Sequence, residues 1–328
     1  MAGPLRPGPW WRPAADSPLR ALEGRLLTHV RARDTRRIEA LAPHLGPNGG
    51  LVLTGSGGAR TQHLLRDPAG YERQAATWRT PFTHGDGLHP VPLDDLLDGQ
   101  REAGAAVAVT PTLLIRAGDA GSLVAVLRAT ARCRREDVLC LLPLAPGWLR
   151  PPFDALLRQA LHDFPIPIAL VTRAGPAVLR DLVERFPGLC LMRTDLSAFD
   201  AMARGSPFAS VEARGGVWID DLLARRDGRD LALMFADTAA PACHCATCRG
   251  RRLDRFVTDE SRSEADAHML EGLSTLHAQL RYVDAPRRPD WWRNRCHDAV
   301  LGYSRWFRRW RSTAALSAST ALRFWADS

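Results

Sequence analysis

Short apolar runs alternate with helical patterns through the first two thirds of the chain. The apolar runs are residues 51–55, 105–115, 138–144, 166–172, 188–194 and 208–213. Between them, apolar residues recur at helical spacing in residues 122–134, 152–164, 176–186 and 196–205. Such runs, bounded by turns and separated by helices, are typical of a parallel sheet covered on both faces. The pattern predicts an α/β fold, a (β/α) TIM-type barrel, with a doubly wound open sheet as the alternative.

The two ends of the chain differ from this region in composition and in the spacing of their apolar residues. Residues 1–18 are rich in proline and predict an irregular arm, and residues 19–43 predict a basic amphipathic helix. Near the other end, residues 260–283 predict one long helix. The tail, residues 286–328, combines tryptophan with arginine. It is either a helix that packs its tryptophans on the barrel or a basic amphipathic helix for RNA or membrane contact.

Composition limits the class of protein only loosely. The formal net charge is +8 over 328 residues, and none of the basic residues is lysine. A basic excess of this size permits an anionic partner such as nucleic acid but does not require one. The amino-terminal residues are too polar for a signal peptide, and no apolar stretch approaches the ~18 residues that a membrane span needs. We therefore expect a cytoplasmic protein without a membrane span.

Three of the seven cysteines form a Cys-x-Cys-x-x-Cys cluster at Cys243, Cys245 and Cys248. Three thiolates from one short loop are a typical partial ligand set for Zn²⁺, which takes its fourth ligand from a separate element. The predicted helix that follows offers His268 and His277. About two and a half helical turns separate these histidines, so they lie on opposite faces and only one can face the loop. The motif predicts a closed, structural zinc site.

The cysteine cluster and the histidine-bearing helix resemble the zinc subdomain of tRNA-guanine transglycosylases. These enzymes are zinc-containing (β/α) barrels that exchange a guanine in tRNA for a deazaguanine, a tRNA modification of the queuosine type. The resemblance favours His268 as the fourth ligand, because a long helix continues after it. Weaker similarities, among them Leu-Thr-Gly-Ser-Gly-Gly at residues 53–58, extend the resemblance over residues 50–283. It implies a Zn²⁺ cofactor, tRNA or another nucleic acid as partner, and a homodimer or partner subunit.

The family's catalytic residues do not carry over to this chain. The matching positions hold Gly55 in place of the acid/base aspartate, and Thr112 and Thr172 in place of the two residues that read the purine. The nucleophilic aspartate falls on Ala209 or Ser210, although a covalent sugar intermediate needs a carboxylate.

Two other carboxylates are candidate catalytic residues. Asp200 lies in a local Ala-Phe-Asp-Ala match, but the surrounding helical pattern favours a solvated helix residue. Asp195 follows an apolar run and either caps the next helix or lines the barrel mouth.

The expected division of the chain is an arm and helix over residues 1–45, a barrel over 46–240, a zinc subdomain over 241–285 and the tail. Three functions remain open. The first is a divergent tRNA-guanine transglycosylase-like protein that acts on or binds nucleic acid, as a glycosyltransferase if it is an enzyme. The second is a non-catalytic barrel that serves as a binding or partner subunit. The third is different chemistry on the same barrel through Asp195 or Asp119.

Overall fold

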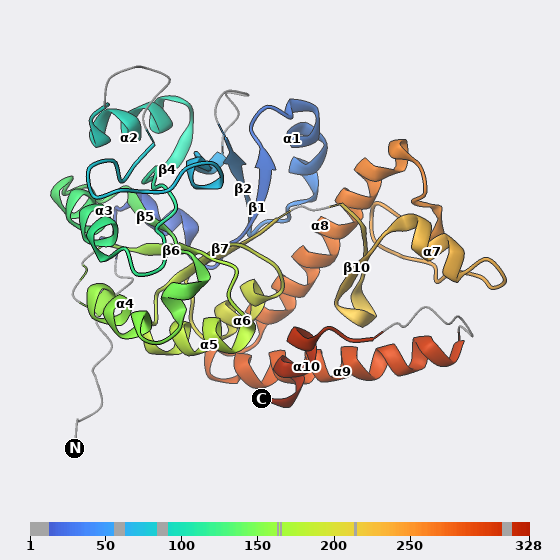
Figure 1. Cartoon of the computed structure of the whole chain (residues 1–328). Coiled ribbons are helices and arrows are strands. Elements are labelled where there is room, and N and C mark those ends of the chain that lie inside the picture. The colour runs from blue at the N-terminus through green and yellow to red at the C-terminus, as the bar shows by residue number, and fades with distance from the viewer. Residues whose placement is uncertain are drawn as a thin grey trace. The chain divides into compact units, whose positions relative to one another are not determined.

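The computed structural model describes residues 13–55, 63–83, 91–162, 164, 166–212, 215–309 and 317–328. Its contacts divide the chain into two compact units. The barrel unit comprises residues 1–35 and 50–212, and the C-terminal unit comprises residues 36–49 and 213–328. Figure 1 shows the elements of both.

Eight parallel strands close into a barrel in the order β1 to β8, and β8 pairs with β1 through Leu26 and Ala209. The strands are β1 (Leu26–Arg31), β2 (Gly49–Thr54), β3 (His63–Asp67), β4 (Ala105–Val109), β5 (Val138–Pro143), β6 (Ile168–Val171), β7 (Cys190–Thr194) and β8 (Ala209–Glu212). The predicted (β/α) barrel is confirmed, and the open sheet is excluded.

Helices between the strands cover the outside of the barrel. They are α2 (Leu93–Glu102), α3 (Ala120–Arg132), α4 (Phe153–His162), α5 (Pro176–Arg185) and α6 (Ser197–Ala203). On β5, Leu139 and Leu141 join the apolar cluster inside the barrel, whereas Cys140 and Leu142 pack with the helices. Both faces of this strand are buried, which explains why it appears in the sequence as an uninterrupted apolar run.

The single helix predicted for residues 19–43 is wrong. The segment forms a 3-10 turn (Pro18–Leu22), strand β1 and helix α1 (Thr35–Leu41). Gly24 breaks the helical path with φ +65° and donates its N–H to the Pro207 carbonyl at 2.7 Å. The apolar spacing was misleading because the first five residues of β1 are all buried, so the strand shows no alternation. The barrel thus begins at Leu26 rather than at residue 46.

The described residues of the C-terminal unit beyond position 212 form a two-stranded antiparallel sheet and several helices, and segment 36–49 belongs to the same unit. Its elements include β9 (Val217–Ile219), β10 (Ala224–Arg226), α7 (Gly228–Met234), α8 (Asp259–Tyr282), α9 (Arg288–Arg309) and α10 (Thr320–Asp327). Helix α8 matches the helix predicted for 260–283 and begins with a capping box between Thr258 and Ser261.

The tail lies in α9 and α10, apart from residues 310–316, which are outside the described ranges. Trp292 and Trp325 are both buried, with ring centroids 5.9 Å apart. Trp306 is buried too and packs edge-on against Phe235. These three tryptophans form core within the C-terminal unit rather than an exposed aromatic face. Among the described helices, none has the length and apolar character required to cross a membrane.

Candidate metal centre and barrel mouth

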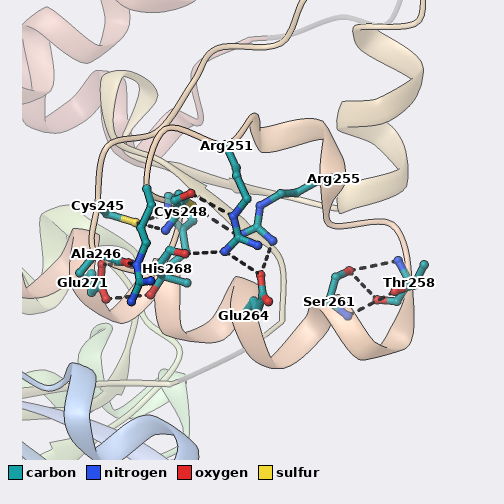
Figure 2. A network of polar contacts seen from close by, with 12 residues as sticks. Cys245, Ala246, Cys248, Arg251, Arg255, Thr258, Ser261, Glu264, His268 and Glu271 are labelled. Atoms are coloured by element: carbon teal, nitrogen blue, oxygen red, sulfur yellow. Dashed lines mark hydrogen bonds and ion pairs between the residues drawn. The ribbon is translucent and has the colours of Figure 1, made fainter.

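The four predicted metal ligands come together in the C-terminal unit. Cys243, Cys245 and Cys248 lie on the loop before α8 and His268 lies on α8, with one potential ligand atom from each within 4.8 Å of the others. His268 Nδ1 lies 3.6, 3.4 and 3.5 Å from the three sulfurs in that order. Figure 2 shows this corner of the unit. His277 takes no part in the cluster, so only one of the two histidines faces the loop, as the helix geometry predicted. That histidine is His268, which the resemblance favoured.

A backbone carbonyl on the side of the ring away from the sulfurs fixes the orientation of His268. Its Nε2 lies 2.7 Å from the Trp218 carbonyl oxygen, so Nε2 carries the proton and donates. The Nδ1 lone pair is then directed at the three sulfurs, which is the usual arrangement of a metal-binding histidine. Burial lowers the pKa of His268, which keeps the ring neutral, and Phe256 stacks on it with ring centroids 5.7 Å apart.

The close approach of β9 to α8 depends on Gly272. A β-carbon at this position would lie 2.3 Å from the Trp218 indole. Only glycine therefore lets Trp218 come near enough for its carbonyl to reach His268.

A tight loop, here called the knuckle (residues 243–252), holds the cysteines. The Cys248 N–H donates to the Cys245 carbonyl at 3.1 Å, and the Gly250 N–H donates to the Cys243 carbonyl at 2.8 Å. Arg249 and Gly250 both have left-handed backbone conformations, with φ of 51° and 84°. Burial raises the pKa of the Cys245 and Cys248 thiols, so holding them as thiolates requires a nearby positive charge.

Glu271, one helical turn after His268, ties the knuckle to the segment 36–49. Its carboxylate accepts hydrogen bonds from the Thr247 N–H at 3.1 Å, the Thr247 hydroxyl at 2.7 Å and His44 Nδ1 at 2.7 Å. Burial alone would raise the pKa of Glu271, but the two hydrogen bonds from Thr247 lower it to about 2. Sequence reasoning missed this residue, although its spacing from His268 places it on the same face of α8.

The three substrate positions suggested by the resemblance lie at the C-terminal ends of barrel strands. Gly55 follows β2 with φ +95°, and no atom of the described residues lies within 4 Å of a β-carbon built there. Thr112 follows β4 and is hydrogen bonded to the Thr110 hydroxyl at 2.9 Å. Thr172 follows β6, and its buried hydroxyl has no hydrogen-bond partner among the described residues. Residues 56–62, which continue from Gly55, lie outside the described ranges.

The candidate aspartates occupy structural positions. Asp195 is exposed and accepts from both the backbone N–H and the hydroxyl of Ser197, the first residue of α6, each at 2.9 Å. Asp119 is the N-cap of α3 and accepts from the backbone N–H and the hydroxyl of Ser122.

The interpretation of Asp200 as a solvated residue is wrong. Asp200 is 3% exposed and accepts from Arg180 at 3.0 and 3.1 Å and from Arg204 at 3.3 Å. Its carboxylate joins α5 to α6 on the helical layer of the barrel.

Carboxylates that the sequence patterns did not predict as a site lie together at the barrel mouth. Asp67 ends β3 and accepts from the Tyr71 hydroxyl at 2.6 Å, which in turn accepts from Arg193 at 3.0 Å. Arg193, on β7, also donates to Glu212 of β8 at 2.8 Å and pairs with Glu72. Burial raises the pKa of Asp67 despite its hydrogen bond from Tyr71.

Arg193 is directed into this network by a backbone irregularity. Its φ is +56°, and the register between β7 and β8 shifts between Leu191 and Thr194. A non-glycine residue in this conformation at a strand end stores strain, which is characteristic of functional sites.

Ser210, one of the two positions matching the family's nucleophile, is fully buried beneath Arg193. Its hydroxyl accepts from the Arg193 backbone N–H at 3.0 Å and lies 2.7 Å from His29 Nε2. His29 Nδ1 lies 3.0 Å from the Thr54 hydroxyl. Burial, and to a lesser extent Arg193, lower the pKa of His29 well below its ordinary value. The three side chains thus form a neutral polar link between β8, β1 and β2.

Comparison with known proteins adds no identification. No protein-family model matches the chain, and searches of curated proteins and of solved structures find no match either.

Proposed function

We propose that the metal centre binds Zn²⁺ as a structural ion. Zinc–sulfur bonds of about 2.3 Å and a zinc–nitrogen bond of about 2.0 Å at the tetrahedral angle separate sulfur from nitrogen by about 3.5 Å. The three separations from His268 Nδ1, at 3.4 to 3.6 Å, fit this value. Three thiolates and one imidazole fill four coordination positions and leave none for substrate, so the ion stabilises the fold rather than performing catalysis.

We further propose that the protein is a divergent tRNA-guanine transglycosylase-like barrel that binds nucleic acid. The observation that carries this proposal is the combination of a closed eight-stranded parallel barrel with a Cys₃His cluster whose histidine comes from the following long helix. Neither feature alone would suggest a nucleic-acid substrate, because barrels and zinc sites both serve many functions. The basic charge of the chain agrees with a polyanionic partner.

Base exchange is the activity to test first, and a non-catalytic binding subunit is the second candidate. Loss of carboxylates at Gly55 and at Ser210 favours the binding subunit. Asp67 and Glu212, at the ends of β3 and β8, favour retained chemistry, since they place carboxylates at the mouth by another route.

The experiment is incorporation of labelled guanine into tRNA by purified, zinc-loaded protein, with binding of the same tRNA measured in parallel over a range of salt concentrations. Incorporation that disappears in Asp67→Asn and Glu212→Gln, but not in Asp181→Asn, which changes a surface carboxylate on α5, would establish an exchange enzyme. Salt-sensitive binding without incorporation would establish the binding subunit. Absence of both would refute a nucleic-acid role.

A further inference from the structure

The knuckle presents a cluster of arginines to solvent in the C-terminal unit. Arg249, Arg251 and Arg252 are all exposed and lie within four consecutive residues that directly follow Cys248. The same loop that surrounds the metal ligands therefore carries a basic surface, here called the arginine knuckle.

Two of these guanidinium groups are held in place by the loop itself. Arg249 Nε donates to the Ala246 carbonyl at 3.1 Å. Arg251 donates to the Cys248 carbonyl at 3.0 Å and to the Thr247 carbonyl at 2.7 Å. Because backbone carbonyls orient these side chains, less rotamer freedom is lost when they bind a ligand than for ordinary surface arginines.

The three arginines of the knuckle differ in whether a carboxylate lies near them. Arg251 lies 3.4 Å from Glu264, which also pairs with Arg255 (Figure 2). Neither Arg249 nor Arg252 has a carboxylate partner among the described residues. Arg249 and Arg252 are thus two positive charges, three residues apart, that no carboxylate of the described residues neutralises. Such a pair suits an anion that repeats along a chain.

We propose that the arginine knuckle binds the phosphodiester backbone of nucleic acid, with Arg249 and Arg252 as the main contacts. This inference rests on the nucleic-acid binding proposed above and assigns it to a surface. The other residues exposed between the first and last cysteines are His244 and Ala246, so the knuckle offers no large apolar side chain to insert into a membrane. The metal acts indirectly, by fixing the loop from which the arginines project.

The test compares two double variants of the full-length, zinc-loaded protein. Arg249→Gln with Arg252→Gln removes two charges from the knuckle, and Arg128→Gln with Arg132→Gln removes two from exposed positions on α3 of the barrel unit. A fluorescently labelled RNA stem–loop and a DNA duplex of equal charge serve as probes, titrated from low to moderate salt.

Each lost phosphate contact should lower the slope of log K against log salt by about 0.7–0.9, so the knuckle variant should lose about 1.5 in slope. At ~0.1 M salt this corresponds to roughly 30-fold weaker binding. The α3 variant should bind within about twofold of the unaltered protein. Zinc content and thermal unfolding are measured on both variants. If Arg249→Gln reduces the zinc content, Arg252→Gln alone decides the question, with half the change in slope.

The outcomes separate the two proposals. Unaltered protein that binds neither probe refutes the nucleic-acid function and the knuckle assignment with it. Binding that both double variants retain, or lose equally, overturns the knuckle assignment alone. Sedimentation with vesicles containing phosphatidylserine, together with no binding of either probe, would assign the arginines to a lipid surface and overturn the inference. Weaker binding of both probes specific to the knuckle variant supports it, and a preference between the probes identifies RNA or DNA.

Discussion

Removing one cysteine ligand should unfold part of the C-terminal unit while leaving the barrel unit folded. Cys248 is fully buried, and His268 is held by the Trp218 carbonyl with its Nδ1 facing the sulfurs. Without the ion, the metal bonds between the knuckle and α8 are lost, and only surface contacts such as those from Thr247 to Glu271 still join the two. Cys248→Ser therefore removes a metal ligand without changing the size of the side chain appreciably.

The magnitude follows from linkage between binding and folding. An ion present at about 1,000 times its dissociation constant stabilises the folded state by about 4 kcal/mol. The C-terminal unit has about 130 residues, a size for which 1 kcal/mol changes the unfolding midpoint by about 3–5 °C. Loss of the ion should therefore lower the midpoint of this unit by roughly 12–20 °C. The barrel unit contributes none of the ligands, so its midpoint should hardly change.

Trypsin reports the change directly, because Arg249, Arg251 and Arg252 are cleavage sites on the knuckle. We expect cleavage there to be slow in the zinc-loaded protein and fast in Cys248→Ser or after chelation, alongside the lower midpoint seen by calorimetry. Cys133→Ser, an equivalent change at a thiol on the barrel unit outside the cluster, is the matched control. Unaltered midpoint and cleavage in Cys248→Ser, or less than about half a zinc per purified chain, would show the reasoning to be wrong.

Three further predictions concern the metal centre, the helical layer of the barrel and the barrel mouth. Glu271→Gln should weaken zinc affinity about 10- to 100-fold in competition with a chromogenic chelator, because it loosens Thr247 beside Cys248; equal affinity would exclude a supporting role. Asp200→Asn should destabilise the barrel unit by about 3–5 kcal/mol in denaturant unfolding, since it removes the buried carboxylate that pairs with Arg180; a change below about 1 kcal/mol would contradict this. Burial lowers the pKa of His29, so the unfolded chain binds the proton first and stability should fall as pH drops below about 6.5. Relative to His29→Asn, the loss should reach about 1.4 kcal/mol per pH unit, and parallel pH profiles would refute it.

The parts of the fold that sequence could predict are those whose signal is local. Strand β5 was readable because both of its faces are buried, one inside the barrel and one under the helices. Strand β1 has the same kind of burial, yet its apolar residues also fit a helical period, and only the left-handed Gly24 separates the two interpretations. Strand β3 contains just two apolar residues, Leu64 and Leu65, between polar ends. This run is too short for the apolar pattern to predict a strand.

The same distinction applies to the two sites. The cysteines of the metal centre are local in sequence. Helix geometry allowed only one of His268 and His277 to face them, and the resemblance favoured His268. The contacts that support the centre are not local: Glu271 meets His44 across 227 residues of sequence. At the barrel mouth, Arg193 meets the Tyr71 hydroxyl across 122 residues, and only the closed barrel brings them together. Propensity and spacing carry no information about such pairs.

The supporting contacts also explain why the chain leaves the barrel after its first strand. Residues 36–49 interrupt the barrel sequence between β1 and β2 but belong to the C-terminal unit. Arg37 pairs with the buried Asp266 of α8 at 2.7 Å, and His44 pairs with Glu271 at 2.7 Å. These two carboxylates flank His268 on the same helix. The excursion therefore places an arginine and a histidine on either side of the metal ligand, and α8 is held from the knuckle and from the amino-terminal segment at once. A chain that kept its barrel contiguous would leave these carboxylates of α8 without partners from this segment. The metal centre is consequently the point at which residues 36–49, the knuckle and α8 are fastened together within one unit.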